Sequence, residues 1–267
     1  MSELAKRGLS GAAYVIVMLA SVYAPVHYLK ILFGLFVLIG SIELFSLNAR
    51  TEPDVPLWWV LLPLVFYFGL AWPIVDLSFG LVLTILVLIF IMTHTLLQQD
   101  LSSFTAVGRI VFTSIYVALP FVLAIRLHER FDFDGLPMLG GLYILVWSND
   151  TFAYLTGRML GKTPMAPKIS PNKTIEGLIG GFLGTLVVAA IINLFNNNLG
   201  SVGWISLAII ATSFGTLGDL FESKLKREAQ VKDSGYLFPG HGGLLDRIDS
   251  LLFVLPATYI IFDLFIP

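Results

Sequence analysis

The residues that most strongly indicate chemistry in this sequence are acidic side chains inside apolar runs. Asp150 lies within the run 145–155, and Asp219 follows the run 213–218. An acid in a membrane-spanning helix costs about 2.5–3.5 kcal/mol on insertion scales, and such residues by default mark functional sites that face a polar cavity. The simpler alternative is a salt bridge between helices, which we favour only for Glu43, because no motif lies near that residue.

Helical spacing places other polar side chains on the same faces as these acids. Residues three or four positions apart lie on one face of a helix, and so do those one turn further along. Three such faces are formed by Asp150 with Tyr154 and Arg158, by Asp219 with Ser223 and Lys226, and by Asp246 with Asp249. Carboxylates beside Lys and Arg suit a hard cation such as Mg²⁺ that carries phosphates. We therefore expect three helices to direct carboxylates to one interface, as phosphoryl or nucleotidyl transfer requires, because its catalysis is mostly positioning and charge neutralisation.

Two further segments of the sequence contain glycine or precede it. The segment 170–174 precedes Glu176, and the segment 239–243 precedes Asp246. Glycine lets backbone N–H groups approach an anion, and helix starts favour anions, although a helix cap and a flexible turn are the simpler interpretations. The run 157–163 resembles a Walker P-loop but has three residues between its glycines where that motif needs four, so we reject it. Two overlapping GxxxG pairs over 177–184 predict close helix packing, within one chain or across a dimer.

The elements that position these residues must be membrane helices. Of the 267 residues, 57% are hydrophobic and only 13% are charged, whereas ordinary soluble domains carry about 25% charged residues. The 16 Lys and Arg residues against 18 Asp and Glu residues argue against a nucleic-acid binder, which would be strongly basic. The absence of cysteine excludes disulfides and Cys-ligated metal sites. The composition therefore predicts an all-α, polytopic membrane protein with a single membrane domain over 1–267.

Nine apolar runs are long enough to cross a bilayer, because each crossing needs about 20 mostly apolar residues. They lie near residues 9–26, 28–48, 57–75, 77–98, 105–127, 136–157, 176–196, 202–222 and 247–266. The first resembles a signal peptide, but no small-residue cleavage site follows it and eight more runs do. The motifs lie within about 136–267, in the last runs and in the loops 158–175 and 223–246, whereas about 1–130 carries none.

The distribution of basic residues predicts that the N-terminus lies in the cytoplasm. In that orientation, only Lys30, Arg126 and Arg130 of the 16 Lys and Arg residues lie on the outer side. Both charge-rich loops then face the cytoplasm. We therefore expect a multi-pass protein of the cell (inner) membrane whose site opens on its cytoplasmic side.

Residues 223–249 resemble the signature of the phosphatidate cytidylyltransferase (CDP-diacylglycerol synthase) family, bacterial type. The residues that carry this resemblance are Ser223, Leu225, Lys226, Arg227, Lys232, Asp233, Gly235, Phe238, Pro239, His241, Gly242, Gly243, Asp246, Arg247 and Asp249. The segments 150–158 and 170–177 are similar to further motifs of that family. The resemblance is long, uninterrupted and specific, and it is strongest over the second half of the chain.

The resemblance implies a membrane nucleotidyltransferase that joins CTP and phosphatidic acid to give CDP-diacylglycerol and pyrophosphate. It also implies Mg²⁺ as cofactor, with a second cation left open, and a homodimer. The lipid phosphate would attack the α-phosphorus of CTP without a general base, because it is already ionised at neutral pH. By this resemblance the expected metal ligands are Asp219 and Asp246, the expected catalytic residues are Asp150, Ser223, Lys226 and Asp249, and the expected phosphate-binding residues are Lys173, Arg227, Arg247 and His241.

Two other functions remain open from the sequence. A CTP-dependent polyprenol or dolichol kinase would present similar charges near the membrane face. In an ion-coupled transporter, Glu43, Asp150 and Asp219 would form an ion path. Transporters, however, place polar residues near the bilayer midplane between repeated halves, and we find no repeat in this sequence.

Overall fold

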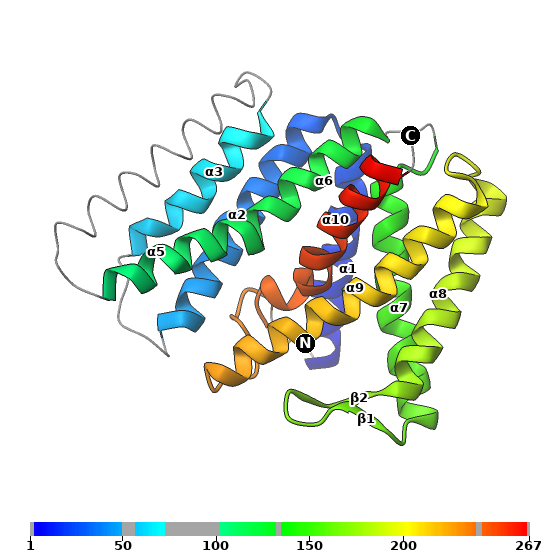
Figure 1. Ribbon diagram of the computed structural model, residues 1–267. Coiled ribbons are helices and arrows are strands. Elements are labelled where there is room, and N and C mark those ends of the chain that lie inside the picture. Colours follow the sequence, from blue (N-terminus) through cyan, green and yellow to red (C-terminus); the bar gives the residue numbers. More distant parts are fainter. Residues whose placement is uncertain (1–2, 50–56, 73–101, 132–134, 239–241, 266–267) are drawn as a thin grey trace.

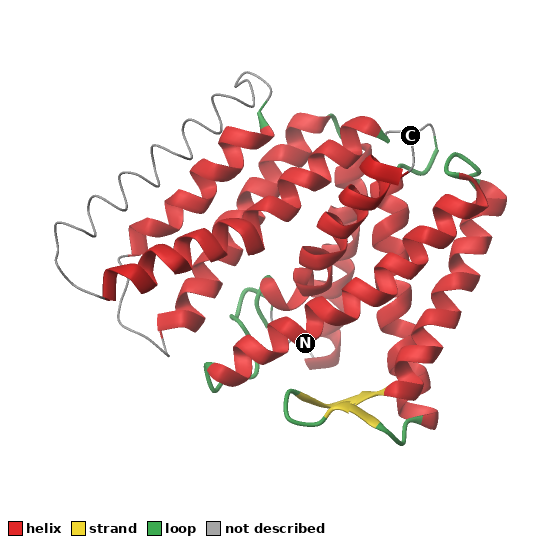
Figure 2. Ribbon diagram, in the orientation of Figure 1, coloured by secondary structure: helices red, strands yellow, loops and turns green. Residues whose placement is uncertain are grey.

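The chain is almost entirely helical over the residues that the computed structural model describes, which are 3–49, 57–72, 102–131, 135–238 and 242–265 (Figures 1 and 2). The helices are α1 (Glu3–Tyr23), α2 (Val26–Ala49), η1 (Leu57–Val60), α3 (Leu61–Ala71), α5 (Ser102–Thr113), η2 (Ser114–Ala118), α6 (Leu119–Arg130), α7 (Met138–Leu160), α8 (Ile175–Phe195), α9 (Gly200–Glu228) and α10 (Leu245–Phe265). Two short antiparallel strands, β1 (Pro164–Ala166) and β2 (Ser170–Thr174), form a hairpin between α7 and α8. The predicted all-helical class is thus confirmed, with this hairpin as an addition.

Four of the described helical segments are long and apolar enough to cross a membrane by length and composition. They are Val26–Leu47, Gly108–Arg130, Ile175–Phe195 and Gly200–Glu228. The predicted run 77–98 lies outside the described residues, so the expected number of nine spans is not confirmed. These helices and the apolar composition make the chain a membrane protein.

The predicted span 57–75 is shorter in the structure than its hydropathy indicates. Its described part is a 3₁₀ turn, η1, followed by the 11-residue helix α3. A helix of that length rises about 16 Å, roughly half of a hydrocarbon core of about 30 Å. The helix ends at Trp72, whose backbone is extended with φ −100° and ψ 122°. The sequence has proline at position 73, and the residue before a proline disfavours helical geometry.

The helical segment 102–130 contains a π-helical turn, η2, in its middle. Pro120 begins the following helix and has no N–H to donate to the preceding turn, which removes one α-helical hydrogen bond and favours such a distortion. Within η2, Tyr116 is buried and packs against Phe221 of α9 and Phe253 of α10, with ring centroids 5.3 Å and 6.3 Å away. An aromatic side chain of the distorted turn thus packs against the two helices that carry Asp219, Asp246 and Asp249.

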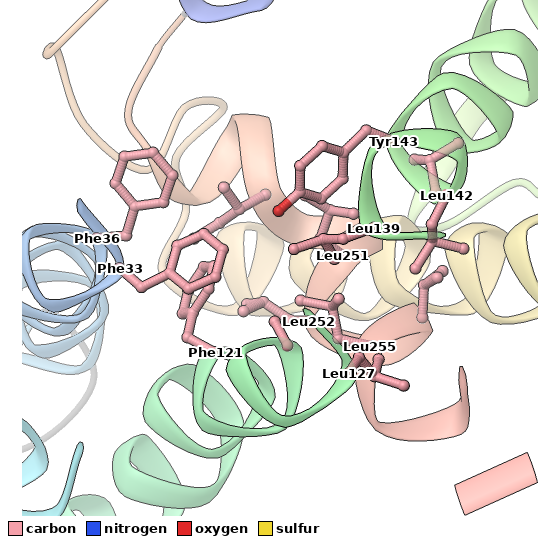
Figure 3. Packing of buried hydrophobic residues seen from close by; sticks show 14 of the residues in the cluster. Phe33, Phe36, Phe121, Leu127, Leu139, Leu142, Tyr143, Leu251, Leu252 and Leu255 are labelled. Atoms are coloured by element: carbon pink, nitrogen blue, oxygen red, sulfur yellow. The ribbon is translucent and has the colours of Figure 1, made fainter. Parts of the chain in front are cut away.

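The apolar core joins the two halves of the chain. Figure 3 shows Phe33 and Phe36 of α2 and Phe121 of α6 packing with Tyr143 of α7 and Leu252 of α10, among other buried residues. Phe33 and Phe121 have ring centroids 4.9 Å apart. Because α2 and α6 precede the motif-bearing part of the sequence, the first half of the chain supports α7 and α10 directly.

Glycines bring α8 against α7 along its length, in agreement with the predicted close packing. A Cβ atom on Gly181 would lie 2.7 Å from the side-chain oxygen of Asn149, and one on Gly184 would collide with the ring of Phe152. The close packing that the GxxxG pairs predicted occurs within this chain. Helices α7 and α8 thus form a closely packed pair, which we call the wall, and they lie side by side in Figure 1.

Replacing Gly184 by Val is expected to destabilise this wall, because the added side chain has no space beside Phe152. Overpacking of this kind costs about 1–3 kcal/mol or more. Thermal unfolding of the purified protein in lipid or detergent measures the effect. Val187→Leu is the matched control, because Val187 lies on the outer face of α8 and is 58% exposed. An unfolding temperature equal to that of the control would contradict the packing argument.

Candidate active site

A cavity of about 630 Å³ opens between α7, α8, α9 and the hairpin. Its polar lining includes Asp150, Tyr154, Arg158, Asn172, Lys173 and Asp219. The predicted face of α7 is confirmed, since the three side chains at i, i+4 and i+8 all line this one cavity. In Figure 1 the hairpin lies at the lower end of the helices, where α9 also ends.

Capping interactions fix the hairpin to the start of α8. Thr174 is the N-cap residue of α8 and accepts a hydrogen bond from the backbone N–H of Gly177 at 3.1 Å, so the interpretation of this segment as a helix cap is correct. Glu176 accepts hydrogen bonds from the backbone N–H groups of Lys162 and Thr163 at 3.0 and 3.1 Å, and from the Thr163 hydroxyl at 2.8 Å. These contacts hold β2, and with it Lys173, over the cavity.

Asp219 and Lys173 form an ion pair across the cavity. Both side chains are partly exposed, at 31% and 27%. The hydroxyl of Ser223 donates a further hydrogen bond to Asp219 Oδ1 at 3.3 Å. The cavity therefore holds one carboxylate and one ammonium group that pair with each other and remain accessible to a charged ligand.

The first turns of α10 approach this group closely. A Cβ atom on Gly218 would lie 2.5 Å from the backbone oxygen of Asp249, so only glycine lets α9 and α10 come this near. The carboxylates of Asp249, Asp219 and Asp150 act on one another electrostatically. Arg247 also acts on Asp150, and its Nε is buried with no hydrogen-bond partner in the described part of the chain. This donor is therefore unsatisfied within the described part of the protein.

A second charged group lies apart from the cavity lining. Lys226 forms ion pairs with Glu222 and, at 2.5 Å, with Asp246 Oδ1. The three side chains are only 12%, 1% and 6% exposed, respectively. The other oxygen of Asp246, Oδ2, accepts hydrogen bonds from the backbone N–H of Ser234 at 2.9 Å, from its hydroxyl at 2.9 Å and from the N–H of Gly243 at 2.7 Å. Glu222, Lys226 and Asp246 form what we call the buried triad.

The structure gives different partners to Asp219 and Lys226, which the helical spacing placed on one face. The two residues do share a helix, but Asp219 pairs with the hairpin, whereas Lys226 pairs within the buried triad. Asp246 has both oxygens hydrogen-bonded to protein groups in this structure, and its role as a metal ligand together with Asp219 stays a prediction. The acid of α10 that acts on the cavity carboxylates is Asp249.

The remaining expected phosphate-binding residues have different positions. Arg227 donates from Nε to the backbone oxygen of Ile169 at 3.3 Å and from Nη1 to that of Val231 at 3.0 Å. It thus links the hairpin to the loop that follows α9, and it is exposed. His241 lies outside the described residues.

The donor set of the cavity fits a hard cation that arrives with phosphates. Over the described residues, no group of three or more His, Cys, Asp or Glu side chains is arranged to hold a metal ion. Two carboxylates, Asp150 and Asp219, do line the cavity. Mg²⁺ is commonly bound by one or two carboxylates together with substrate phosphates and water, rather than by an all-protein cage.

Four residues of these two groups were missed or underrated by the sequence analysis. Thr216 and Asn172 line the cavity, and Thr216 lies one helical turn before Asp219, a spacing that points to it. Ser234 and Glu43 hold the buried triad and its loop. No local pattern indicates these two, because their partners lie up to 202 positions away in sequence.

The comparison with known proteins agrees with the resemblance described above. The model of the cytidylyltransferase family matches residues 5–265. The chain belongs to this family. The name of this family specifies cytidylyl transfer. The chain is therefore a nucleotidyltransferase and not a transporter.

Individual relatives extend the likeness to the whole chain. A protein named phosphatidate cytidylyltransferase from Bacillus subtilis (strain 168) is 36% identical over an alignment that covers 99% of this chain and 100% of the relative. A protein of the same name from Staphylococcus haemolyticus is 41% identical over 172 residues, which cover 64% of this chain and 65% of the relative. The first half, in which we found no motif, thus aligns with this cytidylyltransferase as well.

Proposed function

We propose that this chain transfers the cytidylyl group of CTP to phosphatidate, giving CDP-diacylglycerol and pyrophosphate. The observation that carries this proposal is a cavity that combines accessible carboxylates with Lys173 and Arg158 in a member of the cytidylyltransferase family. Two relatives carry a name that specifies phosphatidate. Family membership favours this reaction over a CTP-dependent lipid kinase.

The reaction is an in-line displacement at phosphorus. An ionised oxygen of the lipid phosphate attacks the α-phosphorus of CTP, the bond from that phosphorus to the bridging oxygen breaks, and pyrophosphate leaves with the electron pair. Catalysis then consists mostly of positioning and charge stabilisation. The cavity matches this requirement, because it contains fixed charges and the nucleophile needs no deprotonation.

The basic side chains near the cavity have distinct tasks in this mechanism. Lys173 exchanges Asp219 for a phosphate oxygen when CTP enters, since the ion pair is partly exposed. Arg158 lines the cavity and Arg247 acts electrostatically on its Asp150, so we assign both to neutralising the other phosphates. Asp219 and Asp150 would hold Mg²⁺, which, when bound, supplies charge neutralisation at the triphosphate.

The proposal includes the arrangement in the membrane. Phosphatidate remains in the bilayer and CTP in water, so the site must lie at the level of the lipid headgroups. Arg158, Lys162, Lys168 and Lys173 gather at the hairpin end of the protein, which supports placing this end in the cytoplasm. The nine-span topology with a cytoplasmic N-terminus, and the homodimer implied by the resemblance, are part of the same proposal.

Labelled CTP tests the proposed reaction. The purified protein is incubated with phosphatidate vesicles and with CTP labelled either in the cytidine or in the γ-phosphate. We expect cytidine label in the lipid fraction and γ-label in released pyrophosphate. Transfer of the γ-label to lipid would identify a kinase instead, and the absence of both labels from lipid would contradict group transfer to phosphatidate.

A further inference from the structure

Glu43 of α2 binds the loop 229–244 and the first turn of α10. Its Oε1 accepts a hydrogen bond from the backbone N–H of Leu244 at 2.8 Å, and its Oε2 accepts one from that of Leu245 at 2.8 Å. The hydroxyl of Ser234 lies 3.0 Å from the same Oε2. The side chain is buried, with the residue 8% exposed. A carboxylate in this place satisfies N–H groups that the start of a helix leaves without partners and also interacts favourably with the helix dipole.

Two glycines allow the loop to close around this carboxylate. A Cβ atom on Gly235 would lie 2.6 Å from Glu43 Oε1, and one on Gly243 would lie 2.5 Å from the same oxygen. Neither glycine has a positive φ, so the backbone conformation does not require glycine at these positions. The requirement is space for Glu43 and, at Gly243, also for the hydroxyl of Ser234. Both glycines belong to the stretch 223–249, which Glu43 reaches from the other half of the chain.

Ser234 connects Glu43 to the buried triad. Its hydroxyl lies 3.0 Å from Glu43 Oε2 and 2.9 Å from Asp246 Oδ2, and one hydroxyl proton serves only one of these acceptors at a time. Asp246 in turn neutralises Lys226. A continuous set of contacts therefore runs from α2 through the loop to α10 and α9.

The first turn of α10 also carries the groups that act on the cavity. Arg247 and Asp249 both follow the residues whose N–H groups Glu43 binds, and both act electrostatically on Asp150. If this turn loosens, Arg247 and Asp249 move relative to the cavity while the cavity's own walls, which come from α7, α8, α9 and the hairpin, remain in place. A displacement of about 1 Å costs roughly 100-fold in rate.

We propose that Glu43 is a positioning residue for cytidylyl transfer, which fixes Ser234 and the first turn of α10 so that Arg247 and Asp249 keep their positions relative to Asp150. This inference rests on the proposed function. None of the hydrogen bonds of Glu43 that the structure describes joins it to a residue that lines the cavity. Its effect should therefore appear mainly in turnover, and in CTP binding only to the extent that Arg247 contributes to it.

Substitutions at Glu43 separate positioning from stability. We expect Glu43→Gln, which keeps the size but offers an N–H group where an acceptor is needed, to lower kcat about 10- to 100-fold per folded molecule. The KM for CTP should change less than kcat, because Lys173 and Arg158, which line the cavity, stay in place. A role in stability alone would instead lower the unfolding temperature and leave kcat of the folded fraction at the wild-type value, which would overturn the proposal.

A double-mutant cycle tests whether the glycine contact acts through Glu43. We expect Gly235→Ala alone to lower kcat about tenfold or more, because its methyl group displaces the carboxylate. In the Glu43→Ala background, the same change should alter kcat by no more than about twofold, since the obstacle is gone. Gly108→Ala is the matched control, because a Cβ atom there meets nothing within 4 Å. Independent, multiplying losses in the double variant would overturn the proposal.

The wild-type protein separates a failure of this inference from a failure of the proposed function. If the wild-type chain incorporates cytidine label into lipid and the Glu43 variants do so at the wild-type rate, the positioning role is wrong and the function stands. If the wild-type chain itself incorporates no label, the proposed function fails and the positioning role falls with it. If Glu43→Ala does not fold, Glu43→Asp replaces it in the double-mutant cycle. The aspartate keeps the charge but withdraws it by one methylene group, and the expected result is the same.

Discussion

Replacing Asp219 by Asn is expected to lower kcat by about 10²–10³, because removal of one preorganised charged group from a reacting centre has an effect of that size. Asp219 lines the cavity, pairs with Lys173 and accepts a hydrogen bond from Ser223. The carboxamide has nearly the same shape but lacks the charge that holds a cation or releases Lys173 to a phosphate. Stability should change little, since partly exposed ion pairs contribute about 0–1 kcal/mol.

The matched control for this variant is Glu228→Gln on the same helix. Glu228 pairs with Lys224 at 3.7 Å, and both side chains are more than half exposed, at 56% and 57%. We expect this control to retain wild-type activity. Initial rates of cytidine-label transfer to phosphatidate, with the unfolding temperature measured in parallel, compare the two. An Asp219→Asn variant as active as the control would remove Asp219 from the catalytic site.

Replacing Lys226 by Met is expected to cost about 3–5 kcal/mol of stability, because it leaves two buried carboxylates without their counter-charge. Glu222 and Asp246 are 1% and 6% exposed, and Lys226 pairs with both. Asp246 retains its hydrogen bonds from Ser234 and Gly243, whereas the side-chain oxygens of Glu222 have no partner other than Lys226 in the described part of the protein. Glu222 should therefore account for most of the loss.

Denaturation of the purified protein in mixed micelles measures this loss of stability. Lys224→Met serves as the control, since Lys224 is exposed and its pair with Glu228 is long, and we expect a change within about 0.5 kcal/mol. Adding Glu222→Gln to Lys226→Met should restore part of the stability, because it removes one uncompensated charge. Equal stabilities of the Lys226 and Lys224 variants would contradict the buried-triad interpretation.

Local patterns in the sequence predicted the helical class and one complete face of the cavity. Apolar runs predicted both ends of α2 and α8 and the start of α9 within two residues, because the length of a helix in a bilayer is set by its hydrophobic content. The charged last turns of α9 extend it to Glu228, beyond the predicted end at 222. The four-residue spacing of Asp150, Tyr154 and Arg158 placed them on one face of α7, and all three line the cavity. Over 57–75, hydropathy alone predicted too long a helix, because it does not record how the residue before a proline ends one.

The amino-acid sequence by itself determined which residues carry charge in an apolar chain, and helical periodicity determined which of them share a face. Only the tertiary structure decided their partners. Asp219 and Lys226 lie seven positions apart on α9, yet one pairs with the hairpin and the other with α10. Glu43, which has no motif around it, binds backbone groups about 200 positions away. Such pairings depend on how helices pack and where loops return, and these are set by long-range contacts that no local spacing records.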